Sequence, residues 1–213
     1  MTQSGGPPAP GTRPAIVGVV PACGKSTRMG EPKGLLDLEG RSFTRRTVEA
    51  LRLGGCDRVV VVTRQGDVAL QREATSAGAD VLENPDPGSG PITSLRLVLE
   101  GLPGGTSHVA WLPLDHPMVT PTSVRTVVTA AQSTDAPVTL PVHGGRRGHP
   151  AVFARRLFEA LKDPELQGGA RTVVHRYLDA GTALLVETDD PGVLVDVDTP
   201  DEYQFLKARR ENR

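Results

Sequence analysis

Short apolar runs alternate along the chain with longer segments whose apolar residues recur at helical spacing. In the first half, the apolar runs predict buried strands over Ala15–Val20, Arg58–Thr63, Asp80–Glu83 and His108–Leu114. Between them, the pattern predicts helices over Phe43–Leu53, Asp67–Ala77 (with Asp67 as N-cap), Pro91–Gly101 and Pro121–Gln132. Strands that alternate with helices are typical of a mostly parallel sheet covered on both faces. We therefore expect an α/β protein with a three-layer α/β/α, Rossmann-like arrangement.

The second half continues the alternation without a break that separates two cores. Strands are expected over Pro137–Val142, Pro150–Phe153, Ala183–Glu187 and Val193–Val197. Helices are expected over Arg155–Lys162, over Ala170–Ala180 and from Pro200 onward. Residues 1–13, rich in Gly and Pro, predict a flexible tail, and residues 14–213 a single domain.

The composition argues against several classes of function. The 24 Lys and Arg residues nearly balance the 25 Asp and Glu residues, for a net charge of −1, so no bulk attraction to nucleic acid or membrane is expected. Aromatic residues make up only 3%, too few for stacking platforms for single strands. Two cysteines cannot form a disulfide framework or a tetrahedral zinc site. The apolar runs fall far short of the ~20 residues of a spanning helix, and we expect a cytoplasmic protein.

A basic, glycine-rich segment follows directly on the first predicted strand. Lys25, Arg28 and Lys33 occur within nine residues, interleaved with Gly24 and Gly30. Such a loop presents backbone N–H groups and positive charge at the carboxyl edge of a sheet, where open α/β folds bind ligands. The sequence therefore predicts a polyphosphate site, with a nucleoside triphosphate as the ligand.

A P-loop is the competing interpretation of Gly24-Lys25-Ser26. That motif needs a glycine five residues before Gly24, where this chain has Val19. It also needs a helix that begins at the Lys-Ser pair, and the glycines and proline that follow would break one. The spacing therefore favours a longer, irregular phosphate loop.

The segment Pro21 to Lys33, PACGKSTRMGEPK, resembles the opening signature of the MobA-like, molybdenum-cofactor-type nucleotidyltransferases, Leu-Ala-Ala-Gly-x-Ser-x-Arg-Met-Gly-x-x-Lys. The resemblance implies that Ala22, Cys23 and Gly24 run along the base and ribose, and that Arg28 and Lys33 hold the triphosphate with help from Lys25. Pro21 and Cys23 replace the usual leucine and alanine, which leaves the choice between CTP and GTP open. Cys23 is interpreted as a small apolar filler rather than a nucleophile, because no base lies near it in sequence.

Two further segments resemble the family's metal and nucleotide motifs. Asn84 to Leu95, NPDPGSGPITSL, matches the second nucleotide-contacting loop, with Gly90, Thr93 and Ser94 at the matching positions. The alternative is that Thr93 and Ser94 only occupy the first turn of a helix. The segment LPLDHPMVTP matches the family's strand and acidic residue, which makes Asp115 the primary Mg²⁺ ligand, while its neighbour His116 is interpreted as a packing residue.

The stretch Val195 to Glu202, VDVDTPDE, resembles the family's Asp-x-Asp-Thr-Pro sequence. Strand alternation would place Asp196 and Asp198 on the same side. One of them is expected to complete the metal site, with Asp198 as first choice. A cap for the last helix is the alternative role, which suits Thr199 better than either aspartate.

The turn Arg147 to Phe153, RGHPAVF, resembles the acceptor side of the cytidylyltransferase branch, as does Gly168 to Arg171. Arg146, Arg147, His149 and Arg171 are candidates to grip an acceptor phosphate. A hairpin tip with solvated arginines is an equal alternative.

Taken together, the resemblance implies a Mg²⁺-dependent nucleotidyltransferase that transfers CMP from CTP to molybdopterin and releases pyrophosphate. A guanylyltransferase using GTP and a sugar-phosphate nucleotidyltransferase of the same fold are alternatives. A third is a non-catalytic nucleotide-binding protein that delivers the cofactor to a client molybdoenzyme.

Overall fold

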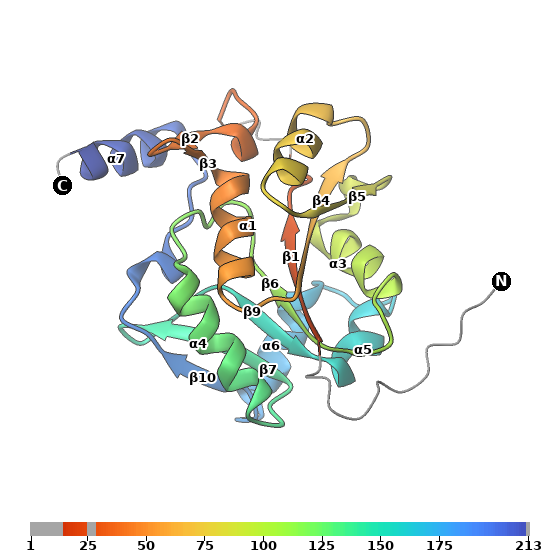
Figure 1. Cartoon of the computed structure of the whole chain (residues 1–213). Helices are drawn as coiled ribbons and strands as arrows, with labels where there is room; N and C mark the ends of the chain where they lie inside the picture. Colours follow the sequence, from red (N-terminus) through yellow and green to blue (C-terminus); the bar gives the residue numbers. More distant parts are fainter. Residues whose placement is uncertain (1–14, 25–28, 212–213) are drawn as a thin grey trace.

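The computed structural model describes residues 15–24 and 29–211. The predicted flexible tail, residues 1–13, lies outside this range, as do Lys25 and Arg28. The described chain forms a central sheet with helices on both faces (Figure 1). This confirms the predicted α/β class.

The central sheet has the strand order β10-β7-β9-β6-β1-β4-β5, with β8 paired to β7. Four pairs are parallel, namely β1–β4, β1–β6, β4–β5 and β7–β10. The antiparallel strand β9 sits between β6 and β7. The strands are β1 (Ala15–Pro21), β4 (Arg58–Arg64), β5 (Asp80–Asn84), β6 (Thr106–Trp111), β7 (Val138–His143), β8 (Arg146–Arg147), β9 (Ala151–Ala154) and β10 (Leu184–Glu187). A separate hairpin joins β2 (Asp37–Leu38) and β3 (Arg41–Ser42).

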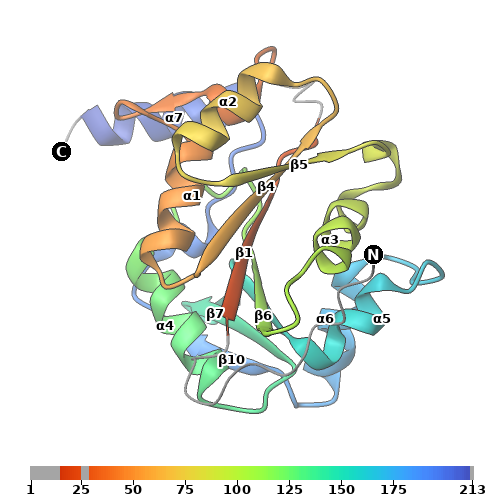
Figure 2. The ribbon, with the colours of Figure 1, turned by 45° about the vertical axis from the view of Figure 1, so that its right-hand side comes forward.

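Helices lie against opposite sides of this sheet (Figure 2). One core contains side chains of α1 (Phe43–Leu53), α2 (Val68–Ser76) and α4 (Pro121–Gln132). The other contains side chains of α3 (Pro91–Glu100), α5 (Phe158–Lys162) and α6 (Ala170–Asp179). The last helix, α7 (Pro200–Glu211), extends outward beside the β2–β3 hairpin (Figure 1).

Local capping explains where the helices on the first face begin. Ser42 accepts the Arg45 N–H at the start of α1, and Thr120 accepts the Ser123 N–H at the start of α4. Asp67 accepts the Leu70 N–H, which confirms the predicted N-cap of α2. These short-range hydrogen bonds are why the predicted helix starts agree with the structure.

Two predicted strands were wrong in extent or kind. The strand predicted to reach Leu114 ends at Trp111, since Pro113 has no N–H to continue the ladder. The strand predicted over Val193–Val197 does not form. Residues 191–194 make a 3-10 turn, η4 (Pro191–Leu194), and the chain then continues without pairing in the sheet.

Two other segments differ more modestly from their predictions. The helix predicted over Arg155–Lys162 begins as a 3-10 turn, η3 (Arg155–Leu157), before α5. The predicted loop after β7 contains β8, which folds back on β7.

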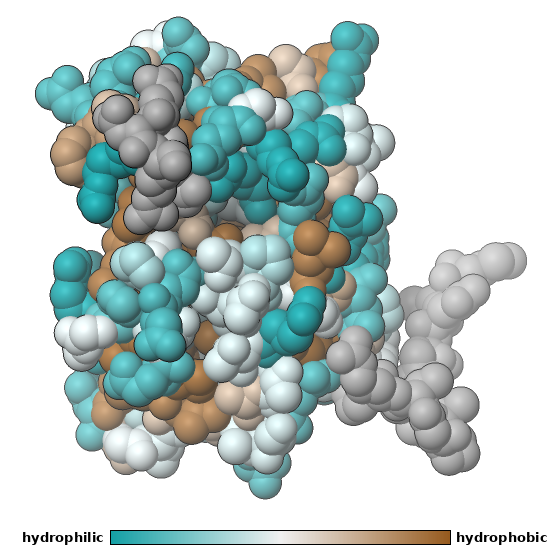
Figure 3. Space-filling view, turned by 60° about the vertical axis from the view of Figure 1, so that its left-hand side comes forward, coloured by the Kyte–Doolittle hydropathy of each residue, from teal (hydrophilic) through white to brown (hydrophobic). Residues whose placement is uncertain are grey.

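Hydrophilic residues cover much of the face in Figure 3, and apolar residues appear in small groups. The large hydrophobic side chains exposed in the described chain are those of Leu35, Leu53, Val68, Leu185 and Phe205. Among the described residues, none of the helices combines the length and apolarity needed to cross a membrane.

Candidate active site

A cleft of about 1100 Å³ opens at the carboxyl ends of β1, β4 and β6. Because these parallel strands are neighbours in the sheet, residues that follow them in sequence meet at one edge. The cleft lining includes Ala22, Cys23, Gly24, Lys33, Arg64, Gly90, Ser94, Asp115, His149 and Asp198. The fold therefore brings most of the described candidates together, and Lys25 and Arg28 lie outside the described residues.

Residues 22 and 23 are held against β4 by several hydrogen bonds. The Val62 carbonyl accepts hydrogen bonds from the Ala22 N–H at 2.8 Å and from the Cys23 thiol at 3.3 Å. Arg64 donates from Nε to the Cys23 carbonyl at 2.7 Å. Burial raises the pKa of the Cys23 thiol, which disfavours the thiolate and agrees with a packing role.

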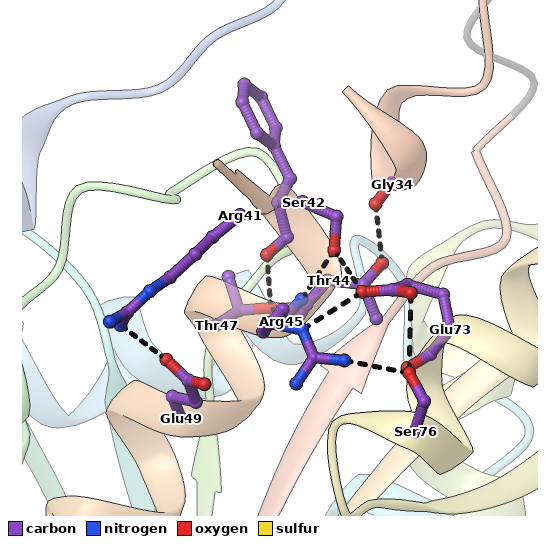
Figure 4. Close-up of polar contacts among 10 residues, drawn as sticks. Gly34, Arg41, Ser42, Thr44, Arg45, Thr47, Glu49, Glu73 and Ser76 are labelled. Carbon is purple, nitrogen blue, oxygen red and sulfur yellow. Dashed lines mark hydrogen bonds and ion pairs between the residues drawn. The ribbon is translucent and has the colours of Figure 1, made fainter. Parts of the chain in front are cut away.

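Lys33 begins a 3-10 turn, η1 (Lys33–Leu35), that is fixed to α1 (Figure 4). The buried Thr44 hydroxyl donates to the Gly34 carbonyl at 2.8 Å. A Cβ at Gly34 would clash with the side chains of Leu70 and Thr44, both of which are buried, so a larger residue here would force them to move. The Lys33 backbone is thus held in place by packing next to it.

The Lys33 side chain forms an ion pair across the cleft. Its Nζ lies 2.6 Å from Asp198 Oδ1, and the two side chains are 13% and 34% exposed. Nothing in the local sequence indicates this pairing, because the two residues are 165 positions apart.

Asp115 lies beside this ion pair. The Val197 N–H donates to the Asp115 carbonyl at 2.9 Å, which brings the segment that carries Asp198 next to Asp115. Burial raises the pKa of Asp115, the Lys33 ammonium acts against this, and the Asp198 carboxylate adds to it. Asp115 Oδ1 is buried and has no hydrogen-bond partner within the described chain, and His116 Nε2 lies 3.8 Å from it.

The two carboxylates have the donor chemistry of a Mg²⁺ site. Mg²⁺ is commonly held by one or two carboxylates together with substrate phosphates and water. The described residues contain no group of three or more His, Cys, Asp or Glu side chains arranged to hold a metal. Asp196 is exposed and does not line the cleft, whereas Asp198 lines it. The strand predicted to carry both residues does not form, but both carboxylates act on the pKa of His116, so both lie near its ring.

Two histidines stand next to Asp115. The rings of His116 and His149 have centroids 4.5 Å apart. Burial lowers the pKa of His116. Burial also lowers the pKa of His149, and with the neighbouring His116 it brings this pKa to about 4. Each ring has a buried Nδ1 without a hydrogen-bond partner in the part of the chain described. Both imidazoles are therefore neutral at pH 7.

The second predicted loop is arranged by Asn84. Its side-chain amide donates to Thr93 Oγ1 at 2.8 Å and to Ser94 Oγ at 3.2 Å. The Thr93 hydroxyl donates to the Gly90 carbonyl at 2.8 Å, and Ser94 Oγ lies 3.5 Å from Cys23 Sγ. Gly90 adopts φ of 90°, a conformation that favours glycine, immediately before α3. Gly90 and Ser94 line the cleft, whereas Thr93 is engaged within the loop.

A second cavity of about 870 Å³ adjoins the cleft and shares Gly90, Pro91, Trp111 and His149 with it. Its lining includes Arg147 and Arg171, and no Asp or Glu among the described residues. Arg146 does not line this cavity and is exposed in β8.

Sequence reasoning missed Arg64 and Trp111, both of which line the cleft. The available signals were an arginine that ends an apolar strand and the chain's single tryptophan.

Comparisons with known proteins agree with this geometry. The molybdenum cofactor cytidylyltransferase of Escherichia coli is 28% identical over 198 residues, which cover 92% of this chain and 97% of that protein. The nicotine blue oxidoreductase of Paenarthrobacter nicotinovorans is 28% identical over 205 residues, which cover 91% and 97%. A Mycobacterium tuberculosis protein crystallised with manganese has a TM-score of 0.72 and 26% identity, and the match covers 91% of this chain and 98% of that one.

The family model for the MobA-like NTP transferase domain matches residues 18–181. The match contains the glycine-rich loop, the second loop, Asp115 and the second cavity's arginines. The chain therefore belongs to the family of MobA-like NTP transferases.

Proposed function

We propose that this chain is a Mg²⁺-dependent cytidylyltransferase that transfers CMP from CTP to the terminal phosphate of molybdopterin and releases pyrophosphate. The observation that carries the proposal is the meeting of Lys33, Asp115 and Asp198 in one cleft with the glycine-rich loop. An ammonium group suits triphosphate oxygens, and a pair of carboxylates suits the cation that accompanies them.

In this proposal, the residues of the chain act by positioning. Lys33, with Arg28 and Lys25, holds the triphosphate, and Asp115 with Asp198 holds Mg²⁺. When bound, the cation neutralises charge on the phosphate oxygens. An acceptor phosphate oxygen attacks the α-phosphorus of CTP, a new phosphorus–oxygen bond forms, and the bond to the β-phosphate oxygen breaks. The attacking oxygen is already anionic, so no side chain is needed as a base.

The second cavity supplies the acceptor side of the proposal. Arg147 and Arg171 occur there without a carboxylate among the described lining residues, which favours an anionic acceptor. Trp111, Leu140 and Phe153 give the same cavity an apolar wall. An apolar, ring-containing body that carries a phosphate fits this combination better than a sugar phosphate. His149 lines both cavities and therefore stands where the acceptor phosphate would meet the nucleotide.

The test is pyrophosphate release with CTP, GTP, UTP and ATP, each with and without molybdopterin. We expect release only with CTP and the acceptor. Asp115→Ala is expected to lower the rate by ~10²-fold or more, as when a charge-stabilising group is lost. Asp135→Ala, at an exposed loop position, is the matched control.

Faster release with GTP would instead assign the guanylyltransferase alternative. Binding of nucleotide without release under any condition would assign the delivery-protein alternative. Normal activity of Asp115→Ala would remove Asp115 as a metal ligand. Because one relative is named nicotine blue oxidoreductase, redox turnover of nicotine blue without pyrophosphate release would contradict the transferase proposal.

A further inference from the structure

Arg64 connects the end of β4 to the loop that follows β1. It is the last residue of β4, it is half-buried, and it lines the cleft. Its Nε donates to the Cys23 carbonyl at 2.7 Å, a contact between residues 41 positions apart. None of the family-derived expectations assigns a role to this arginine.

The residue that Arg64 contacts is fixed from two other directions. The Cys23 thiol donates to the Val62 carbonyl on β4, and the Ser94 hydroxyl at the start of α3 approaches the same sulfur. The Ser94 hydroxyl in turn accepts a hydrogen bond from the side-chain amide of the buried Asn84, at the end of β5. The hydrogen bond from Arg64 thus fixes the direction of the Cys23 carbonyl, while the contacts with Val62 and Ser94 fix the position of the Cys23 side chain.

The position of β4 in the sheet shows which part of the cleft Arg64 serves. Asp115 follows β6, on one side of β1, whereas Arg64 ends β4, on the other side. Lys33 and Asp198 belong with Asp115, as their 2.6 Å ion pair and the Val197–Asp115 hydrogen bond show. The proposed metal-binding carboxylates and Lys33 therefore lie toward β6, whereas Arg64 and Asp67 line the cleft toward β4. In the proposed site the nucleoside would extend toward β4 and β5.

A peptide group is planar and trans, so its C=O and N–H point in opposite directions. By fixing the Cys23 carbonyl, Arg64 also fixes the direction of the Gly24 N–H. Ala22, Cys23 and Gly24 line the cleft. If their backbone groups contact the base, the direction of these groups decides which base edge they match.

We propose that Arg64 is a positioning residue for base selection, acting through the backbone of Cys23 and Gly24. The inference rests on the proposed nucleotide site. It predicts that loss of the guanidinium impairs recognition of the base and leaves recognition of the phosphates intact.

The experiment compares Arg64→Met and Arg64→Lys with Arg58→Met. Arg58 begins the same strand and pairs with Asp80 on the surface, so it controls for loss of an arginine from β4. Fluorescence of Trp111, the single tryptophan of the chain, reports binding in the cleft. The probes are CTP, GTP and inorganic tripolyphosphate, which has the charge of the nucleotide but no base.

For Arg64→Met we expect CTP binding to weaken about tenfold, as for a lost charge-assisted hydrogen bond, and the CTP to GTP preference to shrink. Tripolyphosphate binding should stay within about twofold of wild type, since its contacts lie at the other end of the cleft. Arg64→Lys should recover part of the preference, because an ammonium also donates to a carbonyl. Arg58→Met should match wild type with all three probes.

Equal weakening of all three probes by Arg64→Met would make Arg64 a phosphate ligand and overturn the proposal. Unchanged binding of CTP and GTP would overturn it as well. Circular dichroism checks the folding of Arg64→Met, and Arg64→Lys provides the test if the methionine variant does not fold. A wild-type protein that binds none of the probes would instead contradict the proposed nucleotide site.

Discussion

Replacing Lys33 by methionine is expected to strengthen the binding of a divalent cation alone and to weaken the binding of nucleotide. In the structure, Lys33 Nζ lies 2.6 Å from Asp198 Oδ1, so a cation that approaches Asp198 must displace the ammonium group. Methionine is similar in length to lysine and carries no charge. The substitution removes the competitor without opening a large space.

The size of the effect follows from the exposure of the pair. A hydrogen bond to a charged group contributes about 1.5–3 kcal/mol. The Asp198 side chain is 34% exposed, and solvent screening reduces the contribution to the low end of this range. A gain of about 1.4 kcal/mol corresponds to roughly tenfold tighter binding of the cation. Nucleotide binding should fall by a similar factor, because Lys33 is proposed to contact the triphosphate.

The assay is titration of Mn²⁺ monitored by the electron paramagnetic resonance of the free ion, with and without CTP. Lys162→Met is the matched control, since Lys162 pairs with Glu159 on the distant helix α5. We expect Lys33→Met to bind Mn²⁺ more tightly and CTP more weakly than the wild-type protein. Mn²⁺ binding that is unchanged or weaker in Lys33→Met would refute the competition between ammonium and metal.

Three further outcomes follow from individual residues. Cys23→Ala should retain most of the turnover rate, because the contacts of the thiol, to the Val62 carbonyl and the Ser94 hydroxyl, hold the loop in place. Loss of activity comparable to that of Asp115→Ala would make the thiol catalytic. Burial raises the pKa of Asp190, but hydrogen bonds from the start of α4 and from Gly192 outweigh this and lower it below 3.8. Asp190→Ala should therefore cost about 2 kcal/mol of unfolding free energy at pH 7. That difference should shrink as the pH falls through the depressed pKa, because the part due to the ionised carboxylate is lost, and urea unfolding at several pH values measures it. Gly148→Ala should lower the free energy of thermal unfolding by about 1–3 kcal/mol, since its Cβ would clash with the backbone carbonyl of Val193. Gly101→Ala is the control, because a Cβ there would make only ordinary van der Waals contacts.

Local signals were sufficient for much of the fold. The β1 run, the Asp67 cap and the glycine that ends α1 all act within a few residues, so the sequence predicts them well. The prediction of a strand over Val193–Val197 was wrong because the alternation of side chains in this segment resembles that of a half-buried strand. Its hydrogen bonds go instead to the backbone of His149 and Asp115, which lie in other parts of the sequence.

The site shows the same division. The glycine-rich loop could be predicted as a binding loop because it follows a predicted strand, whereas the role expected of Asp115 came from the resemblance to a family. The pairing of Lys33 with Asp198 spans 165 positions, and the contact of Arg64 with Cys23 spans 41. No pattern of spacing encodes such contacts, since they depend on which strands become neighbours. The resemblance to a family supplied Asp198 but not Arg64.

The family match ends at residue 181, whereas Asp198 lies on the stretch that follows it. Lys33 therefore lies inside the matched segment, and the carboxylate that it contacts lies outside it. A fragment that ends near residue 181 would retain the glycine-rich loop and Asp115 but would lack Asp198. Activity measured on the matched segment alone would therefore not test the proposed metal site.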